Sequence, residues 1–312
     1  MKRTSYPIHS DFKRWRNVHP PLYRILILPL QWFLGIQFYL ERTTKEFAVK
    51  RILIPTSDTA SIKAIFYSPK GIGKDAPCLL YCHGGGFVLP SSYFHFYWIK
   101  KYAREAGCYV LFVNYRLAPR YPFPAAPLDC FASYKWLLDH ANELSVDPRR
   151  IGVGGDSAGG CLAAVITQMA KDQELVLPCL QLLIYPATGV DRPSESMTKY
   201  IDTPMCNTRD MEKYSYYYLK KAKIDHPIYL KPTLGTSFAG FPPTYVETAE
   251  FDCLRDHGIF YAENLMRDGV KVSLNNTAGT IHGFDVEIKS MIVRECVAKR
   301  IAFLKEHFKA TS

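Results

Sequence analysis

One pentapeptide, Gly155-Asp156-Ser157-Ala158-Gly159, places a serine between glycines where a strand-like run meets a helix-like run. Apolar residues precede it at 151–153, and small apolar residues follow at 161–166. Only glycine fits beside the serine in so tight a turn without a Cβ clash, and the strained turn lifts the hydroxyl clear of the sheet. The pattern predicts a nucleophilic serine at position 157; a tight turn selected for packing alone is the alternative.

Apolar runs without polar alternation recur along the chain and predict strands buried on both faces of a parallel sheet. An antiparallel hairpin is expected before them, and helices between and after them. The expected strands are 48–55, 62–67, 78–82, 109–113, 151–153, 180–185, 244–249 and 270–274, and the expected helices 129–143, 256–267 and 290–308. This order predicts an α/β fold with a mostly parallel central sheet and helices on both faces.

Residues 187–240 interrupt this rhythm, because they are polar, aromatic and punctuated by prolines. We interpret them as an insertion at the carboxyl edge of the sheet, a lid between the catalytic-domain segments 47–186 and 241–312. Residues 1–46 form a separate N-terminal helical segment. The insertion contains a group of four tyrosines, for which half-buried packing is favoured over a recognition role: Tyr214, Tyr216, Tyr217 and Tyr218.

A serine hydroxyl needs a general base and a group that orients this base. Asp252 follows the expected strand 244–249, and His282 lies beyond the expected strand 270–274. Functional groups gather at the carboxyl ends of parallel strands, and the order Ser157, Asp252, His282 suits such a sheet. Glu250 and Asp256 are rivals of Asp252, although Asp256 is expected to cap the helix that follows. The alternative for His282 is a surface-loop histidine.

The segment His83-Gly84-Gly85-Gly86 directly follows an expected strand. Consecutive glycines let backbone N–H groups approach a ligand closely, so Gly85, Gly86 and Ala158 are candidate donors to an oxyanion. His83 and Gly84 are expected to shape the loop. Phosphate binding is the alternative, but the lysine of a phosphate-binding loop is missing from this segment.

The formal net charge of +10 is concentrated near the N-terminus, where residues 1–51 hold ten Lys or Arg against Asp11, Glu41 and Glu46. A solvated basic face is the favoured explanation, and the absence of RNA-reading or helix-turn-helix motifs argues against a nucleic-acid partner. The nine cysteines suggest free thiols in a reducing compartment, and the histidine and cysteine spacings do not favour a metal site. We therefore expect a cytoplasmic protein.

Residues 22–40 are the most membrane-like part of the sequence, but Arg24, Pro29, Gln31 and Gln37 interrupt the apolar run. The run is far shorter than the roughly 20 residues of a membrane span. We favour an amphipathic, aromatic-rich helix that lies on the protein, and membrane contact by residues 22–40 is the less favoured alternative.

Five motifs together resemble the hormone-sensitive-lipase-like branch of the α/β-hydrolases, serine esterases that include arylacetamide deacetylase-like enzymes. The resemblance covers the chain from about residue 75 to its end. The motifs are His83-Gly84-Gly85-Gly86-Phe87, Tyr115-Arg116-Leu117-Ala118-Pro119, Gly155-Asp156-Ser157-Ala158-Gly159-Gly160, the run 252–256 and His282-Gly283-Phe284.

The resemblance implies a catalytic triad of Ser157, Asp252 and His282, with the amides of Gly85, Gly86 and Ala158 as the oxyanion hole. It also implies a cap built from the N-terminal residues and the insertion after Pro186. Three positions depart from the family pattern: Arg120, Cys161 and Cys253 stand where Glu, Asn and Pro are common. The change to Arg120 is expected to alter either a buried ion pair or the surface near the active-site loops.

The leading hypothesis is a cofactor-free carboxylesterase that acts on small-molecule esters with short to medium acyl or aryl groups. An amidase or deacetylase with the same triad is the alternative, because the triad cannot separate the two reactions. A non-catalytic small-molecule receptor is the third hypothesis, since gibberellin receptors resemble this family but lack the histidine present here at position 282. A homodimer is also consistent with the resemblance.

Overall fold

The computed structural model describes residues 6–56, 59–191 and 194–309. The chain forms an α/β fold whose sheet, within these residues, has eight strands in the order β1-β2-β4-β3-β5-β6-β7-β8. The strands are β1 Phe47–Pro55, β2 Ser61–Pro69, β3 Ala76–Cys82, β4 Tyr109–Asn114, β5 Val146–Asp156, β6 Gln181–Ile184, β7 Thr244–Phe251 and β8 Val272–Ile281. Strand β2 pairs antiparallel with β1 and β4, and the pairs from β4 to β8 are parallel. The predicted fold class and hairpin are confirmed.

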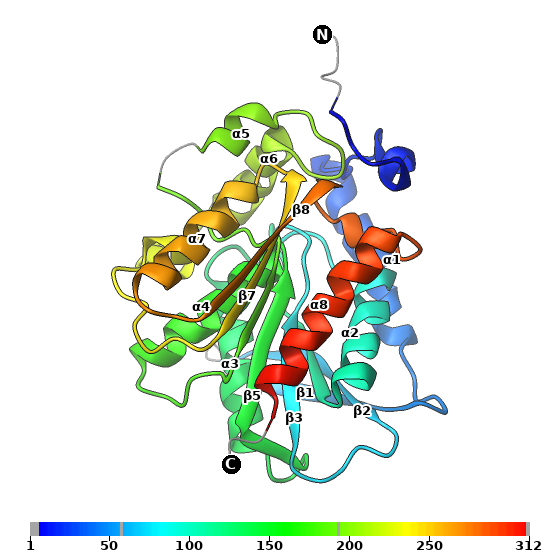
Figure 1. Cartoon of the computed structure of the whole chain (residues 1–312), viewed down its shortest axis with the longest axis vertical. Coiled ribbons are helices and arrows are strands. Elements are labelled where there is room, and N and C mark those ends of the chain that lie inside the picture. The colour runs from blue at the N-terminus through cyan, green and yellow to red at the C-terminus, as the bar shows by residue number, and fades with distance from the viewer. Residues whose placement is uncertain (1–5, 57–58, 192–193, 310–312) are drawn as a thin grey trace.

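Helices cover both faces of the sheet (Figure 1). Helices α2 and α8 pack together on one face, while α3, α4 and α7 lie on the other. Their bounds are α2 Tyr93–Ala106, α3 Ala125–Asp139, α4 Ala158–Asp172, α7 Arg255–Arg267 and α8 Met291–His307. This two-sided cover explains the continuous apolarity of the central strands, since every residue of β3 is buried.

The remaining elements lie mainly around the carboxyl ends of the parallel strands. Helices α5 and α6 lie beyond the arrowheads of β7 and β8 in Figure 1. The bounds are η1 Ser10–Trp15, α1 Arg24–Leu40, α5 Glu195–Lys199, α6 Thr208–Leu219, η2 Pro227–Tyr229, η3 Pro232–Leu234 and η4 Phe284–Val286, where η marks a 3-10 helix. Residues 1–5 of the predicted N-terminal segment and 192–193 of the predicted insertion lie outside the described residues.

Several predicted boundaries are wrong: β5 runs from Val146 to Asp156 instead of covering 151–153, and α3 ends at Asp139 instead of 143. The last strand continues to Ile281 instead of ending near Leu274, because its polar residues alternate between exposed and partly buried positions along the edge of the sheet. Helix α3 begins at Ala125, four residues before the predicted start, with Pro127 accommodated in its first turn.

A fully buried arginine joins three elements beneath the site region. The Arg300 guanidinium on α8 pairs with the Glu247 carboxylate on β7 and lies 2.9 Å from Asp285 Oδ2 in η4. It also donates to the Tyr102 hydroxyl at 2.9 Å. Tyr185 donates its hydroxyl hydrogen to Asp285 Oδ1. One cation thus satisfies two buried carboxylates, and the cluster holds the turn that follows residue 282.

Substituting Arg300 with methionine is expected to lower the free energy of unfolding by about 3–5 kcal/mol, because it leaves two buried carboxylates without their cation. Urea denaturation followed by circular dichroism measures this change. Arg294→Met on the same helix is the matched control, since Arg294 is exposed, and should change stability by less than about 0.5 kcal/mol. Equal stability of the two variants would contradict this account of the cluster.

Candidate active site

Ser157 occupies the turn between β5 and α4 with a backbone φ of 54°, which is unfavourable for a residue with a side chain. The neighbouring glycines make this turn feasible. A Cβ at Gly155 or at Gly159 would overlap the carbonyl oxygen of Cys82. The predicted requirement for glycine beside the serine therefore has a direct cause in the close approach of β3.

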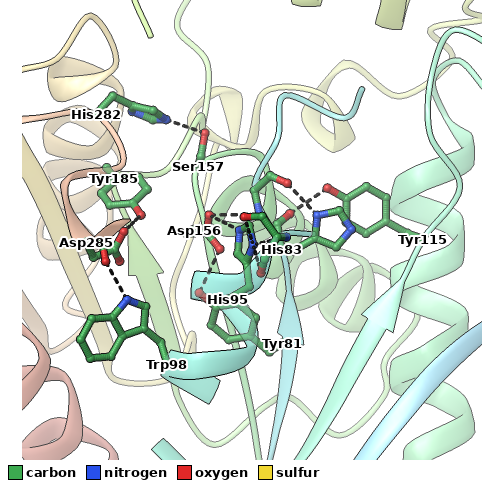
Figure 2. A network of polar contacts seen from close by, with 12 residues as sticks. Tyr81, His83, His95, Trp98, Tyr115, Asp156, Ser157, Tyr185, His282 and Asp285 are labelled. Atoms are coloured by element: carbon green, nitrogen blue, oxygen red, sulfur yellow. Dashed lines mark hydrogen bonds and ion pairs between the residues drawn. The ribbon is translucent and has the colours of Figure 1, made fainter. Parts of the chain in front are cut away.

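The structure brings Ser157, His282 and Asp252 into one chain of hydrogen bonds. His282 Nε2 lies 2.8 Å from Ser157 Oγ, and His282 Nδ1 lies 2.7 Å from Asp252 Oδ2 (Figure 2 shows the first contact). Because His282 donates its Nδ1 hydrogen to Asp252 Oδ2, the neutral ring has no hydrogen on Nε2, which is free to accept the serine hydroxyl hydrogen. Asp252 is fully buried, and its second oxygen accepts the Leu254 amide at 2.8 Å.

The two rival carboxylates have other partners. Glu250 Oε2 accepts the Gly279 amide at 2.7 Å. Asp256 accepts the Ser196 amide at 2.7 Å and pairs with Arg255. The predicted capping role of Asp256 is wrong, because the N-cap of α7 is Leu254 and makes no side-chain cap. Asp256 instead ties the start of α5 to α7.

Burial is the largest single influence on His282 and lowers its pKa, but the adjacent Asp252 carboxylate, with smaller contributions from Cys206 and Asp156, raises the pKa to about 9. Asp252 therefore stabilises the imidazolium that forms when the ring accepts a proton. Because the pKa is raised, the fraction of molecules with a neutral His282 ring, the form able to act as a base, is small at neutral pH and increases as the pH rises.

We expect kcat/KM for a neutral ester to rise with pH along a limb whose midpoint lies above 6.5 and approaches about 9, because the raised pKa of His282 sets the fraction of neutral base. Initial rates over a pH series, corrected for spontaneous hydrolysis, measure this limb. A midpoint below 6.5 would contradict the influence assigned to Asp252.

The glycine loop after β3 lies beside the serine, and Gly85 and Gly86 line the same cavity as Ser157. Both glycines have positive φ, 115° and 61°. A Cβ on Gly85 would overlap the Leu89 carbonyl, and one on Gly86 would overlap the ring of Tyr214 on α6. Ala158 is the first residue of α4, where amides lack partners within the helix. This arrangement can present backbone N–H groups to a developing oxyanion.

His83 and Gly84 lie behind the loop. Buried His83 stacks on Tyr115 at 4.4 Å and donates from Nδ1 to the Gly84 carbonyl at 2.6 Å. Burial lowers the pKa of His83 to about 3, so its ring is neutral. Gly84 donates its amide hydrogen to Asp156 Oδ2 at 3.1 Å, and a Cβ there would overlap that oxygen.

The role of Asp156 was not predicted from the sequence: its carboxylate connects the glycine loop to the serine turn. Asp156 accepts the Tyr81 hydroxyl at 3.0 Å and His95 Nε2 at 3.2 Å (Figure 2). The Ser92 amide donates to His95 Nδ1 at 2.9 Å, which leaves the hydrogen on Nε2. A buried acid directly before Ser157 was the available signal, but its partners are distant in sequence.

Comparison with known proteins agrees with this geometry: residues 79–286 match a family model described as alpha/beta hydrolase fold. The chain belongs to the α/β-hydrolase family. It is 37% identical over 211 residues to "Esterase LipI" of Mycobacterium tuberculosis, covering 67% of this chain and 66% of the relative. It is 30% identical over 296 residues to "Arylacetamide deacetylase" of Bos taurus, covering 75% and 71%. The resemblance predicted from the motifs is confirmed.

Solved structures resemble this α/β-hydrolase over nearly its whole length. "Bacterial Heroin Esterase" superposes with a TM-score of 0.87 at 30% identity and covers 97% of this chain and 99% of that one. "Esterase LipW from Mycobacterium marinum" gives a TM-score of 0.88 at 27% identity, with 97% of each chain covered. The N-terminal and inserted helices therefore belong to an arrangement that recurs among these hydrolases.

A partly open cavity of about 750 Å³ lies above Ser157 and His282. Its walls come from the glycine loop, the N-terminal residues and the insertion, and they are mainly apolar. Apolar lining residues include Val18, Leu34, Met197, Met205, Met211, Tyr214, Tyr218, Leu219 and Leu230. Tyr217 is buried as well, whereas Tyr216 is 51% exposed. Three of the four tyrosines thus pack in the interior, and two of these, Tyr214 and Tyr218, also line the cavity.

The three departures from the family pattern leave the triad untouched. Arg120 is exposed and lies 5.4 Å over the Tyr121 ring, so it affects the surface and not a buried ion pair. Cys161 is buried behind the serine turn, with Sγ 3.8 Å from the Leu230 carbonyl. Cys253 is a buried free thiol directly after Asp252.

Proposed function

We propose that this α/β-hydrolase is a serine carboxylesterase for esters with short to medium acyl or aryl groups. The observation that carries the proposal is the hydrogen-bonded chain from Ser157 through His282 to Asp252 at the base of an apolar cavity. No other group within reach of the Ser157 hydroxyl is as well placed to accept its proton among the described residues. Relatives named "Carboxylesterase NlhH" and "Ethyl acetate hydrolase" support the same reaction.

Ser157 Oγ attacks the ester carbonyl carbon while His282 Nε2 takes the hydroxyl proton. The carbonyl oxygen becomes an oxyanion, which the amides of Gly85, Gly86 and Ala158 stabilise. When the intermediate collapses, the C–O bond to the alcohol breaks and His282 returns the proton to the leaving oxygen. An acyl-enzyme remains on Ser157. Water, deprotonated by His282, then attacks this ester, and the carboxylic acid leaves as Ser157 regains its proton.

The shape and chemistry of the cavity support modest apolar substrates. A volume of about 750 Å³ lies in the range of cavities that enclose a small organic molecule. The methionines at positions 197, 205 and 211 supply flexible apolar walls, which accommodate both alkyl and aryl groups. Neutral esters suit this surface better than strongly charged ones.

An amidase or deacetylase is the second candidate, favoured by the similarity to the protein named "Arylacetamide deacetylase". Both reactions use the same serine, base and oxyanion donors. They differ in the leaving group, because an amine must be protonated before it departs. A receptor without catalysis is disfavoured by the 2.8 Å contact between His282 and Ser157.

A substrate series separates these functions. We expect p-nitrophenyl esters from acetate to octanoate to be hydrolysed, with kcat/KM greatest for short or medium chains, and 4-nitroacetanilide to be hydrolysed far more slowly than p-nitrophenyl acetate. Intact-mass measurement during turnover should detect an acyl group on the protein. Comparable kcat/KM for the anilide and the acetate would assign the amidase function instead. A protein that turns over none of these compounds would overturn the proposal.

A further inference from the structure

Helix α1 exposes an unusually large apolar surface. Of its 17 residues, only Ile27 and Phe38 are buried. Of the 22 large hydrophobic side chains that are exposed in the described part of the chain, nine belong to α1 or directly precede it. They are Tyr23, Ile25, Leu26, Leu28, Trp32, Phe33, Ile36, Tyr39 and Leu40. A concentration of this kind marks an interaction site rather than ordinary surface scatter.

The contacts that α1 makes with the rest of the protein show which side of the helix faces inward and which faces solvent. Gln31 Nε2 donates to the carbonyls of Val88 and Ala118, each at 2.7 Å. Ile27 and Phe38 are 0% and 1% exposed and complete this inner side. Trp32 and Phe33, by contrast, are 74% and 65% exposed. Figure 1 shows α1 (blue) at the side of the molecule, next to α2.

The apolar face is bordered by positive charge. Arg24 is exposed at the start of α1, and Arg42 and Lys45 are exposed shortly after its end. Lys63 Nζ lies 3.1 Å from the Tyr39 hydroxyl at the same end of the helix. The acids that follow the helix are paired with bases, Glu41 with Lys100 and Glu46 with Arg104. The border therefore favours an anionic partner.

We propose that the outer face of α1 docks on a lipid surface that contains anionic headgroups, with the helix lying in the plane of the interface. Aromatic and aliphatic side chains would enter the boundary between headgroups and acyl chains, while the flanking Arg and Lys contact lipid phosphates. The proposal does not require α1 to cross the bilayer: among the described residues no helix has the length and apolarity to do so. We name this surface, formed by the nine exposed side chains given above, the α1 face.

A second copy of this chain fits the α1 face less well. Each copy has a formal net charge of +10, and a symmetric contact through α1 brings the same basic borders toward each other. A lipid surface instead supplies both the apolar layer and the opposite charge.

The α1 face also adjoins the catalytic cavity. Leu34 on α1 and the preceding residues 18–21 form part of the cavity wall. Docking would therefore place that wall of the cavity against the lipid, where apolar esters accumulate. Binding itself does not depend on the proposed catalysis, so Ser157→Ala should bind vesicles as well as the wild-type chain.

Vesicle flotation of the full chain tests the proposal. We expect the wild-type protein to float with vesicles of phosphatidylcholine and phosphatidylglycerol, less with pure phosphatidylcholine, and less at high salt. The double variant Trp32→Ser/Phe33→Ser should lose at least about tenfold in partitioning, because two large apolar side chains no longer enter the lipid. Its turnover of a soluble p-nitrophenyl ester should match wild type, which shows that it folds.

The control variant Val176→Ser/Met291→Ser removes two exposed apolar side chains elsewhere, each about as exposed as Phe33, and should float like wild type. The proposal is overturned if wild type stays with the unbound protein, if both double variants float equally, or if pure phosphatidylcholine binds as well as the anionic mixture. Light scattering supplies a further decisive result: a wild-type dimer that becomes monomeric in Trp32→Ser/Phe33→Ser would assign the α1 face to self-association.

Discussion

Replacing Ser157 with alanine is expected to lower kcat for p-nitrophenyl butyrate by about 10⁶-fold, the size of the loss seen when a triad nucleophile is removed. Without Oγ no acyl-enzyme can form, and His282 Nε2 loses the hydroxyl 2.8 Å away. Alanine keeps the Cβ and creates no new contact at the turn, so the fold should persist. Initial rates at saturating and limiting ester, with thermal unfolding measured in parallel, provide the test.

Ser215→Ala is the matched control, because Ser215 lines the same cavity but makes no contact with His282 in the described structure. We expect this variant to retain kcat/KM within a few-fold of wild type. If Ser157→Ala and Ser215→Ala hydrolyse the ester at similar rates, the assignment of the nucleophile is wrong.

Replacing Asp252 with asparagine is expected to lower kcat by about 10⁴-fold, by analogy with a triad aspartate changed to an amide. The amide cannot hold the tautomer with hydrogen on Nδ1, and it removes the negative charge 2.7 Å from the ring. The pKa of His282 should then fall from its raised value, so any residual activity should reach its plateau at lower pH. A pH series of kcat on the variant measures both effects.

Glu250→Gln and Asp256→Asn test the rival carboxylates under the same conditions. Glu250 accepts the Gly279 amide, and Asp256 contacts Ser196 and Arg255; none of these contacts involves the ring of His282. Both variants should keep kcat within about tenfold of wild type. An Asp256→Asn loss as large as that of Asp252→Asn would transfer the orienting role to Asp256.

The sequence predicted the sheet well where burial is complete. Strands β3 and β4 read as unbroken apolar runs because helices cover both of their faces. Strand β8 was predicted too short, because an edge strand with polar and apolar residues in alternation resembles a loop beyond its apolar start. The start of α3 was placed late, because prolines at 122, 124 and 127 resemble a helix boundary.

The residues of the candidate site also fall into two groups, those that the sequence predicted and those that it did not. Motif order and the geometry of parallel strands locate the ends of strands without knowledge of packing. This was enough to propose Ser157, Asp252 and His282 as the catalytic residues. The contacts of Asp156 with Tyr81 and His95 could not be predicted, because they join residues that lie 75 and 61 positions apart in the sequence. The lining of the cavity was equally hidden, because the insertion has no regular apolar period from which its facing residues can be inferred.

The overlap that a side chain at Gly86 would make with the Tyr214 ring restricts how specificity can change within this hydrolase. The ring of Tyr214 packs against Gly86, in the loop that we propose supplies the oxyanion donors. A chimaera that takes its insertion from a relative therefore needs a flat ring of similar size at this one position. The contact between Gly86 and Tyr214 thus links the part of the cavity that faces the substrate to the loop proposed to stabilise the transition state.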